Sequence, residues 1–291
     1  MEKLLMNIKN QNTIIINNPK LKKMKIKNLN LKNFALAILA FIFASCSSSE
    51  NATDNTPNAT QYILPRKVTS GSNVTIANYN GNKLIEFVNS PLEKEVTTYT
   101  GDFITKQEKF SNGLSTRIEN YTYEGGKLKT YYRKNANSDF EYTTTYTHNT
   151  SDISFTLKIK DITVTTPNSE VISNTGQIFI TNGNISKIIN NTKNLPVNET
   201  RTTTSTYEYD NKNNFLLNIL GFNLLINQSI SSSVNNVVKS TFLFESSLNG
   251  VAQPSSTSVE TVTLAYNSNN YPIERQQFFS SSSDPKIFIE Y

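Results

Sequence analysis

Alternating apolar and polar positions run through most of the chain after residue 61 and predict β-strands. One such run places five residues at alternate positions: Phe140, Tyr142, Thr144, Tyr146 and His148. The residues between them are one glutamate and three threonines. Because successive side chains of a strand point to opposite faces, the run predicts one aromatic face and one hydroxyl-rich, hydrated face. Residues 201–209 repeat the pattern, with Tyr207 and Tyr209 on the side of Arg201.

A longer phrase recurs: an aromatic strand, a Gly/Asn/Asp turn and a hydrophobic returning strand. Copies lie at residues 79–87, 99–104, 121–128, 207–215 and 266–273. Glycine and asparagine supply the positive φ angles that tight hairpin turns require. Consecutive hairpins predict an all-β antiparallel meander that forms one large twisted or curved sheet, with a sandwich or half-barrel as folded forms of it.

Residues 214–226 break the alternation with a run rich in Leu, Ile and Phe. Asn214 is a suitable N-cap and Gly221 a suitable C-terminal residue, so the segment predicts a short helix near 214–221. Its apolar positions fall on one side at helical spacing: Phe215, Leu216, Ile219 and Leu220. We expect a hydrophobic plug over the sheet; a lipid-contacting element is the alternative.

The Tyr-x-Tyr-Asp/Glu phrase with its Asn/Gly turn resembles the YD-type (Rhs-like) repeats. It is more closely similar to surface lipoproteins of the Bacteroidota that carry degenerate copies. The general residue pattern of these repeats extends over residues 62–291, but recognisable copies of the motif lie only in 207–226 and 264–276. Because the copies depart from regular spacing, a closed Rhs-type shell is not expected. The resemblance implies no catalytic residues.

The amino-terminal part has the order of a secretory signal: a Lys-rich stretch, an apolar run from Phe34 to Ala44, and Cys46. The string ending at Cys46, the only cysteine, resembles a bacterial lipobox. The run is too short for a spanning helix, which needs about 20 residues. We expect a signal peptide over 1–45, a lipidated Cys46, a flexible tether over 46–60 and a β-domain over 61–291. Because 45 residues make a long leader, Met24 is the proposed alternative start of translation.

The tether is polar and low in apolar residues, as flexible linkers are. Ser47 to Glu50, followed by Asp54, resembles the short signal that sends lipoproteins of the Bacteroidota to the cell surface. We therefore expect an outer-membrane lipoprotein that is exposed at the surface, with the periplasmic leaflet as the alternative.

The balance of basic and acidic residues after the signal peptide limits the classes of binding partner. Residues 1–45 hold eight of the 28 Lys and Arg and one of the 23 Asp and Glu, which leaves 20 basic and 22 acidic groups. The basic footprint of a nucleic-acid binder is absent from that part. The expected partners are the membrane, through Cys46, and a glycan, a peptide or an outer-membrane protein.

Catalytic and metal-binding patterns are sparse. His148 is the only histidine and precedes a turn, where we expect it to face solvent, and lipidation would occupy Cys46. Zinc needs several His or Cys ligands, and none cluster. Asp210 to Asn214 alternate oxygen ligands but lack the glycine and distal glutamate of an EF-hand, so an Asx-rich turn is expected. No catalytic residue, metal or cofactor is predicted.

Three functions remain. The first is a non-enzymatic scaffold or binding module, in which the 14 tyrosines, all after Cys46, serve the core and offer binding faces. The second is a carrier that holds a lipid or hydrophobic ligand beneath the plug, and a large apolar cavity would favour it. The third is a carbohydrate-active enzyme, which needs two carboxylates facing each other across a groove.

Overall fold

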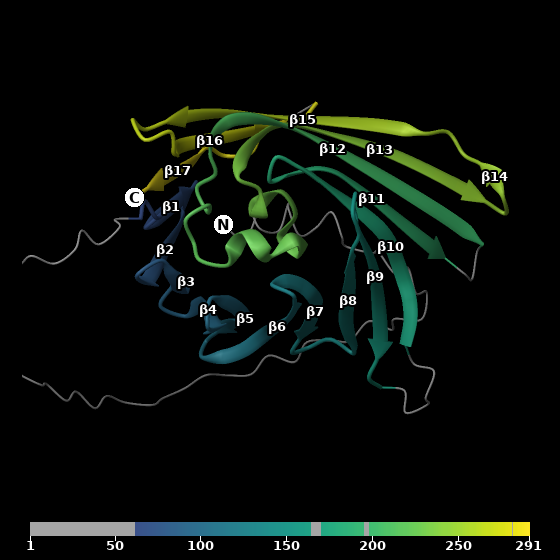
Figure 1. Cartoon of the computed structure of the whole chain (residues 1–291), viewed down its shortest axis with the longest axis horizontal. Helices are drawn as coiled ribbons and strands as arrows, with labels where there is room; N and C mark the ends of the chain where they lie inside the picture. Colours follow the sequence, from purple (N-terminus) through teal and green to yellow (C-terminus); the bar gives the residue numbers. More distant parts are fainter. Residues whose placement is uncertain (1–61, 164–169, 195–197, 281) are drawn as a thin grey trace, which may run out of the picture. The chain divides into compact units, whose positions relative to one another are not determined.

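The computed structural model describes residues 62–163, 170–194, 198–280 and 282–291, which contain 17 strands and two short 3-10 helices (Figure 1). The signal, the tether and Cys46 lie outside the described residues. The strands are β1 (Lys67–Ser70), β2 (Asn73–Asn80), β3 (Lys83–Ser90), β4 (Glu93–Thr100), β5 (Phe103–Ser111), β6 (Leu114–Glu124), β7 (Lys127–Asn135), β8 (Phe140–His148), β9 (Ile153–Asp161), β10 (Glu170–Thr181), β11 (Asn184–Asn194), β12 (Glu199–Asn213), β13 (Asn235–Leu248), β14 (Val251–Ala252), β15 (Ser256–Tyr266), β16 (Pro272–Phe278) and β17 (Ile287–Glu290). The helices are η2 (Phe222–Leu224) and η3 (Ile226–Ser232), and among the described residues no helix is long and apolar enough to span a bilayer.

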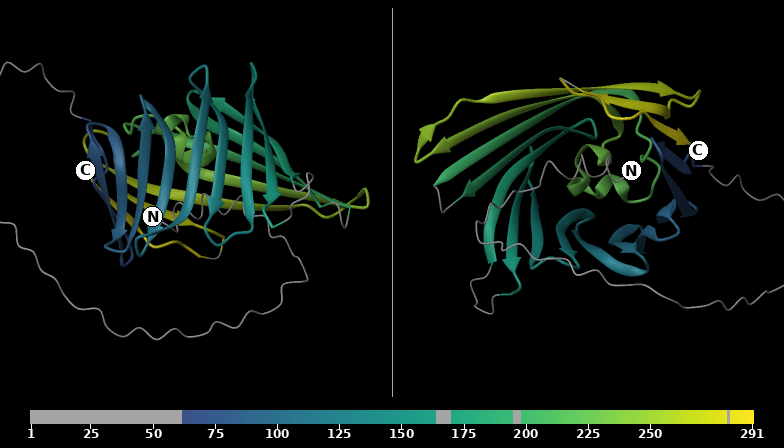
Figure 2. Two further views of the ribbon diagram at one scale, coloured as in Figure 1. Left: turned by 90° about the horizontal axis from the view of Figure 1, so that it is seen from below. Right: turned by 180° about the vertical axis from the view of Figure 1, so that it is seen from behind.

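The strands form a closed barrel, as the views in Figures 1 and 2 show. Each strand pairs antiparallel with its sequence neighbour, except that β13 bypasses the two-residue β14 to pair with β15. The first strand pairs with the last, from Lys67 opposite Glu290 to Ser70 opposite Ile287. The wall therefore has 16 strands, with β14 as an extra one.

The predicted all-β antiparallel meander is confirmed, and the open sheet, sandwich or half-barrel is replaced by a full barrel. Alternation along a strand is the same in an open sheet and in a barrel with a filled interior. The pairing of β1 with β17 joins segments more than 200 residues apart, and β17 has only four residues. No local sequence pattern predicts the pairing of two strands so far apart in the chain.

The recurring phrase has a structural counterpart at one end of the barrel. The turns at Gly81 and Gly101 have a positive φ at the first turn residue, and Gly125–Gly126 has it at both, as the two hairpin turn types require. Directly before these turns the register shifts at Tyr79, Tyr99 and Tyr123, which leaves one extra residue on the returning strand. Such bulges increase twist and bend a strand, so the repeated bulge curls the sheet toward closure.

The inner face of the barrel carries the core. Residues 214–233, termed here the plug, lie within the ring of strands (Figure 1), and their apolar side chains pack against inward residues of the wall. Leu84, Ile104 and Leu225 have no exposed surface. The predicted faces are confirmed: Tyr146 and Tyr207 are buried, whereas Thr145 between the inward positions of β8 is exposed.

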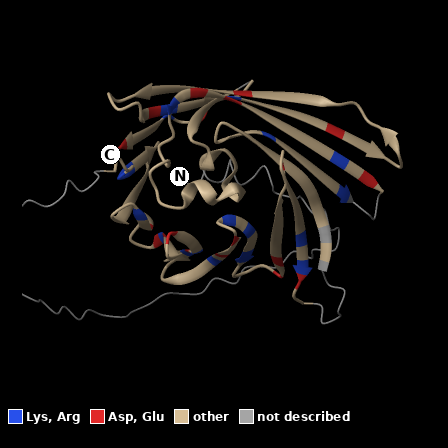
Figure 3. Cartoon of the chain, in the orientation of Figure 1, with Lys and Arg blue, Asp and Glu red and all other residues tan. Residues whose placement is uncertain are grey.

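The outer face is rich in polar side chains. Charged residues are spread over the strands rather than gathered at the ends (Figure 3), and many pair across neighbouring strands. Such pairs are Lys67–Glu290, Lys94–Glu86, Lys134–Glu141 and Lys239–Glu208. Threonines occupy many of the remaining outward positions, and apolar side chains are exposed among them, including Val74 and Ile76 on β2 and Phe288 on β17. The outer face of the described strands therefore mixes charged, hydroxyl and apolar groups.

Candidate binding site in the barrel lumen

The plug consists of overlapping tight turns. Its backbone N–H groups bond to carbonyls three residues earlier, as from Leu217 to Asn214 (3.1 Å) and from Gln228 to Leu225 (2.7 Å). Asn214 caps the first turn, because its Oδ1 accepts a hydrogen bond from the N–H of Leu216 (2.9 Å). Asn214 therefore caps a tight turn here, and not the helix that the sequence predicted.

The predicted helix over 214–221 is wrong in type and position, because 3-10 helices form only later, at η2 and η3. Gly221 adopts a φ of 72°, which interrupts the segment, and a Cβ there would lie 2.8 Å from the carbonyl oxygen of Asp102. Backbone groups of Leu220 that a helix would pair internally are bonded to the wall instead. Its N–H donates to the carbonyl of Asn82 (2.9 Å), and its carbonyl accepts from the hydroxyl of Tyr99 (3.1 Å). These contacts fix the plug at the end of the barrel that holds the Gly81 and Gly101 turns.

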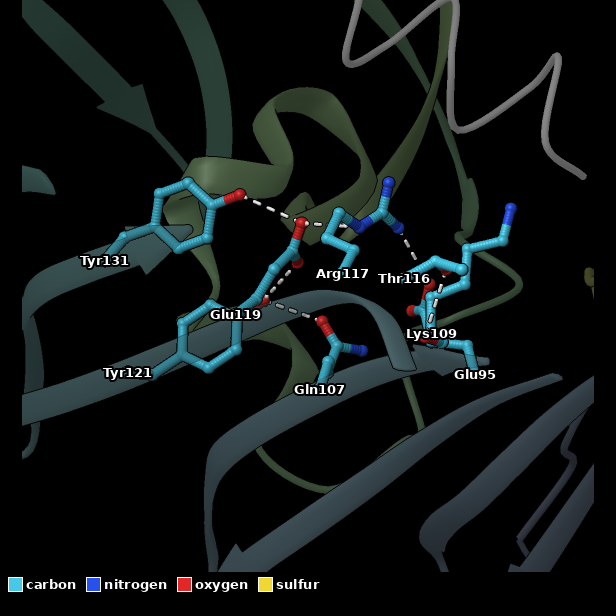
Figure 4. Close-up of polar contacts among 8 residues, drawn as sticks. All are labelled: Glu95, Gln107, Lys109, Thr116, Arg117, Glu119, Tyr121 and Tyr131. Carbon is cyan, nitrogen blue, oxygen red and sulfur yellow. Dashed lines mark hydrogen bonds and ion pairs between the residues drawn. The ribbon is translucent and has the colours of Figure 1, made fainter. Parts of the chain in front are cut away.

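Below the plug, a group of charged side chains and tyrosines from β4, β6 and β7 points into the lumen (Figure 4). Arg117 bridges two carboxylates, with its Nη2 3.0 Å from Glu95 Oε2 and its Nε 3.3 Å from Glu119 Oε1. Glu119 is 1% exposed and accepts hydrogen bonds from the hydroxyls of Tyr121 and Tyr131, both at 3.0 Å. We call these five residues the charged cluster.

The local charges have clear electrostatic consequences. Burial lowers the pKa of Arg117, but the negative charges of Glu119 and Glu95 outweigh burial and raise it overall. Burial, followed by the charge of Glu119, raises the pKa of Tyr121 and of Tyr131 well above the ordinary value. The arginine therefore stays protonated and both tyrosines stay neutral donors.

A second polar chain lies on β15 and β16. Arg275 donates through Nη2 to Gln277 Oε1 (2.8 Å), and Gln277 Nε2 donates to Glu260 Oε2 (2.7 Å). Burial lowers the pKa of Arg275 to about 10, although the charges of Asp284 and Glu260 act in the opposite direction. Burial also raises the pKa of Glu260, against the effect of Arg275.

A pocket lies between the plug and these two parts of the wall, with about 840 Å³ of empty space when its opening to solvent is included. The enclosed part that admits water is far smaller and has room for only a few water molecules. Plug residues such as Phe215, Phe222 and Ile230 form one side, and Glu95 and Arg275 are among the polar residues of the wall. The lining therefore combines a flat apolar surface with both signs of charge.

Two buried atoms at this pocket have no hydrogen-bond partner among the residues that the structure describes. They are Oε1 of Gln228, a residue that is 2% exposed, and Nη1 of Arg275. Buried polar groups in native proteins are almost always paired, and leaving one unpaired costs about 1–3 kcal/mol. One unused acceptor and one unused donor therefore belong to residues that line a space able to hold a ligand or water.

The residues singled out in the sequence have structural roles. His148 does not face solvent: it ends β8 partly buried, and its Nε2 lies 2.8 Å from the carbonyl oxygen of Leu128. Asp210 Oδ1 accepts from the N–H groups of Lys212 (3.0 Å) and Asn236 (3.1 Å), so the predicted Asx turn is confirmed. Within the described ranges, no three His, Cys, Asp or Glu residues gather as metal ligands would.

The charged residues of the lumen were missed in the sequence. Arg117 and Glu119 share the parity of Tyr121 and Tyr123 along one strand, and that parity is the signal that could have placed them inside. Charge on a strand otherwise suggests a hydrated face, and nothing local distinguishes the two cases. Arg275, two residues from the buried Gln277, carries no comparable signal.

No known protein family matches the sequence, and no curated protein matches it. Solved structures with a similar fold are known, and two of them are porin-like proteins. A porin-like protein from Bacteroides vulgatus has a TM-score of 0.53 and 13% sequence identity, over 79% of this chain and 99% of that chain. A porin-like protein from Bacteroides uniformis has a TM-score of 0.43 and 10% identity, over 78% of this chain and 96% of that chain. The first likeness shows a shared β-barrel fold, and neither bears on YD-type repeats or on a lipid anchor.

Proposed function

We propose that this protein is a non-enzymatic binding module of the cell envelope that holds a small amphipathic ligand inside its barrel. The observation that carries the proposal is the pocket beneath the plug. One side is apolar, through Phe215 and Phe222, and the other offers charged and amide groups. Binding sites for small molecules are concave, largely apolar and supplied with a few polar groups that orient the ligand.

The outer wall supports a barrel that stands in water. Barrels that span a bilayer present an apolar outward band between aromatic girdles, and a Lys or Arg facing lipid at the midplane costs about 2–4 kcal/mol. Here Lys94, Lys134 and Lys239 face outward along the strands and pair with glutamates. The lumen is occupied by the plug, which argues against a water-filled channel.

Attachment to the membrane falls to Cys46. We propose that a lipidated Cys46 anchors the barrel through the tether at the outer membrane, with surface exposure ahead of the periplasmic leaflet. The lipobox resemblance and the Ser/acidic stretch after it support this assignment. Mass spectrometry of the mature amino terminus tests the lipid, and protease treatment of intact cells tests exposure.

The two alternative functions find less support. A carrier of long acyl chains needs a deep apolar cavity, and here the plug fills much of the lumen. A carbohydrate-active enzyme needs one carboxylate as acid and another as base or nucleophile, whereas Glu95 and Glu119 are both bound by Arg117. Binding without chemistry is the function that this arrangement serves best.

A pair of tryptophan variants on β15 tests the proposal, because the chain has no tryptophan. Leu264 lines the pocket, and its neighbour Thr263 is exposed on the outer face. The full chain carrying Cys46→Ser, with either Leu264→Trp or Thr263→Trp, is titrated with a library of small amphipathic compounds. We expect ligands to change the tryptophan emission of the lumen variant only, and to bind the parent chain more tightly. Equal responses of both variants would rule out the pocket.

A further inference from the structure

We propose that the ligand of this pocket is a small zwitterion of amino-acid size, with an amine, a carboxylate and an apolar group. The inference rests on the binding function proposed above and adds the chemical class of the ligand. Three parts of the lining carry it: Arg275 from β16, Glu95 with Gln228, and the aromatic side of the plug.

Arg275 is the group that would hold the carboxylate. Its Nη2 is committed to Gln277 at 2.8 Å, while its Nη1 is buried at the pocket without a partner among the described residues. A guanidinium pairs with carboxylates in a planar arrangement of parallel hydrogen bonds. The charges of Glu260 and Asp284 act on the same arginine, so they reduce its attraction for an anion without using its Nη1.

Glu95 and Gln228 are the groups that would receive the amine. Glu95 lines the pocket, and its Oε2 accepts from Arg117 Nη2 at 3.0 Å. The side-chain oxygen of Gln228 is an unused acceptor that is sealed from solvent. An ammonium has three donors and no acceptor, so it suits a lining that offers a carboxylate from the wall and an amide oxygen from the plug.

Simple ions fit this lining less well. A lone anion would satisfy Arg275 but would leave Glu95 facing a second negative charge. A lone cation would satisfy Glu95 and Gln228 but would leave the free donor of Arg275 unpaired. A zwitterion would pair its carboxylate with Arg275 and its amine with Glu95 and Gln228. Apolar contact for its side chain would come from Phe215, Phe222 and Ile230. The limited enclosed space restricts the whole ligand to about the size of leucine.

The test uses four forms of one ligand: L-leucine, L-leucine amide, N-acetyl-L-leucine and N-acetyl-L-leucine amide. Binding to the full Cys46→Ser chain is measured by calorimetry. We expect L-leucine to bind at least tenfold more tightly than the amide, which lacks the carboxylate, or the acetylated form, which lacks the amine. The doubly blocked form should bind most weakly. L-phenylalanine and its derivatives form a second series.

Variants assign each discrimination to a residue. Arg275→Met removes both the positive charge and the fork, and should abolish the preference for the carboxylate over the amide. Glu95→Gln should abolish the preference for the free amine. Lys129→Met, at an exposed ion pair with Glu124, is the control and should leave all affinities unchanged. Thermal unfolding of each variant checks that it is folded.

The outcomes separate this inference from the proposed function. If the doubly blocked ligand binds as tightly as L-leucine and its binding is weakened by Leu264→Trp, the pocket binds amphipathic molecules and the zwitterion is wrong. If no compound of either series and no member of the amphipathic library responds at the pocket, the binding function itself fails. The series on the parent chain decides even where a variant does not fold.

Discussion

Arg117→Met is the sharpest test of the charged cluster, because it keeps a long side chain and removes the charge. The substitution leaves two carboxylates without their shared cation: Glu95, whose side chain is 12% exposed, and Glu119, whose side chain is 1% exposed. Removing one partner of a buried ion pair costs about 3–5 kcal/mol. Because the Arg117 side chain is itself 24% exposed, we expect about 3 kcal/mol. For a domain of this size that lowers Tm by about 6–12 °C.

The loss in this variant should depend on pH. Without Arg117, the ionised Glu119 is a buried charge that has lost the cation paired with it, and burial disfavours a charged carboxylate. A group of that kind destabilises the fold when it is ionised, so the deficit is largest near neutral pH. It shrinks as pH falls toward the ordinary glutamate value of about 4.3, because protonated Glu119 no longer buries a charge. Adding Glu119→Gln to Arg117→Met should remove the pH dependence and recover stability.

Urea unfolding followed by tyrosine fluorescence and far-ultraviolet circular dichroism measures these differences. The matched control is Lys129→Met, which removes the cation of an exposed pair with Glu124 at 2.9 Å. Such surface pairs contribute about 0–1 kcal/mol. If Arg117→Met costs no more than Lys129→Met, or if its deficit does not change between pH 7 and pH 4.5, the reasoning about a buried, charge-compensated cluster is refuted.

Three further predictions concern the wall. Leu84→Ala, at a side chain with no exposed surface, should cost about 2–5 kcal/mol, whereas Leu92→Ala, 60% exposed, should stay within about 0.5 kcal/mol in the same urea titration. Gly176→Ala should cost about 3 kcal/mol or fail to fold, because its Cβ would overlap a backbone carbonyl of β11 and an aromatic ring of β9; a folded variant of parent stability would contradict that packing. Because burial raises the pKa of Tyr121 and Tyr131, stability should fall as pH rises above about 10, the ordinary tyrosine value. Absorbance at about 295 nm should show their ionisation together with unfolding, and ionisation in the folded state would argue against their burial.

The sequence predicts the strands of this fold well, because each strand records its own environment. In residues 140–148 and 201–209 the alternation identifies the buried face, and the glycine turns fall where the phrase places them. Closure is different. It depends on four residue pairs between β1 and β17 and on bulges whose extra residue changes no composition. These features belong to the whole sheet and leave no local pattern.

The plug shows the same limit at a smaller scale. Its apolar character predicts burial correctly, but its conformation is set by partners on the wall. Leu220 bonds to Asn82 and Tyr99, and Gly221 lies against the Asp102 carbonyl. Isolated short helices are weak, so these tertiary contacts decide between a helix and successive tight turns. The pocket in the lumen depends on the conformation of the plug, so local sequence patterns could not predict it either.

Closure of the sheet and the presence of the plug together explain why the barrel interior contains a candidate binding site. A ring of 16 strands encloses more space than inward side chains alone can fill, so an empty lumen would admit water throughout. The plug fills the end that holds the Gly81 and Gly101 turns, where Leu220 and Gly221 contact the wall. Below it the inward positions change from apolar residues such as Ile104 to the polar Gln107 on the same strand. The pocket lies where the apolar and polar layers meet, and the proposed ligand combines both characters for that reason.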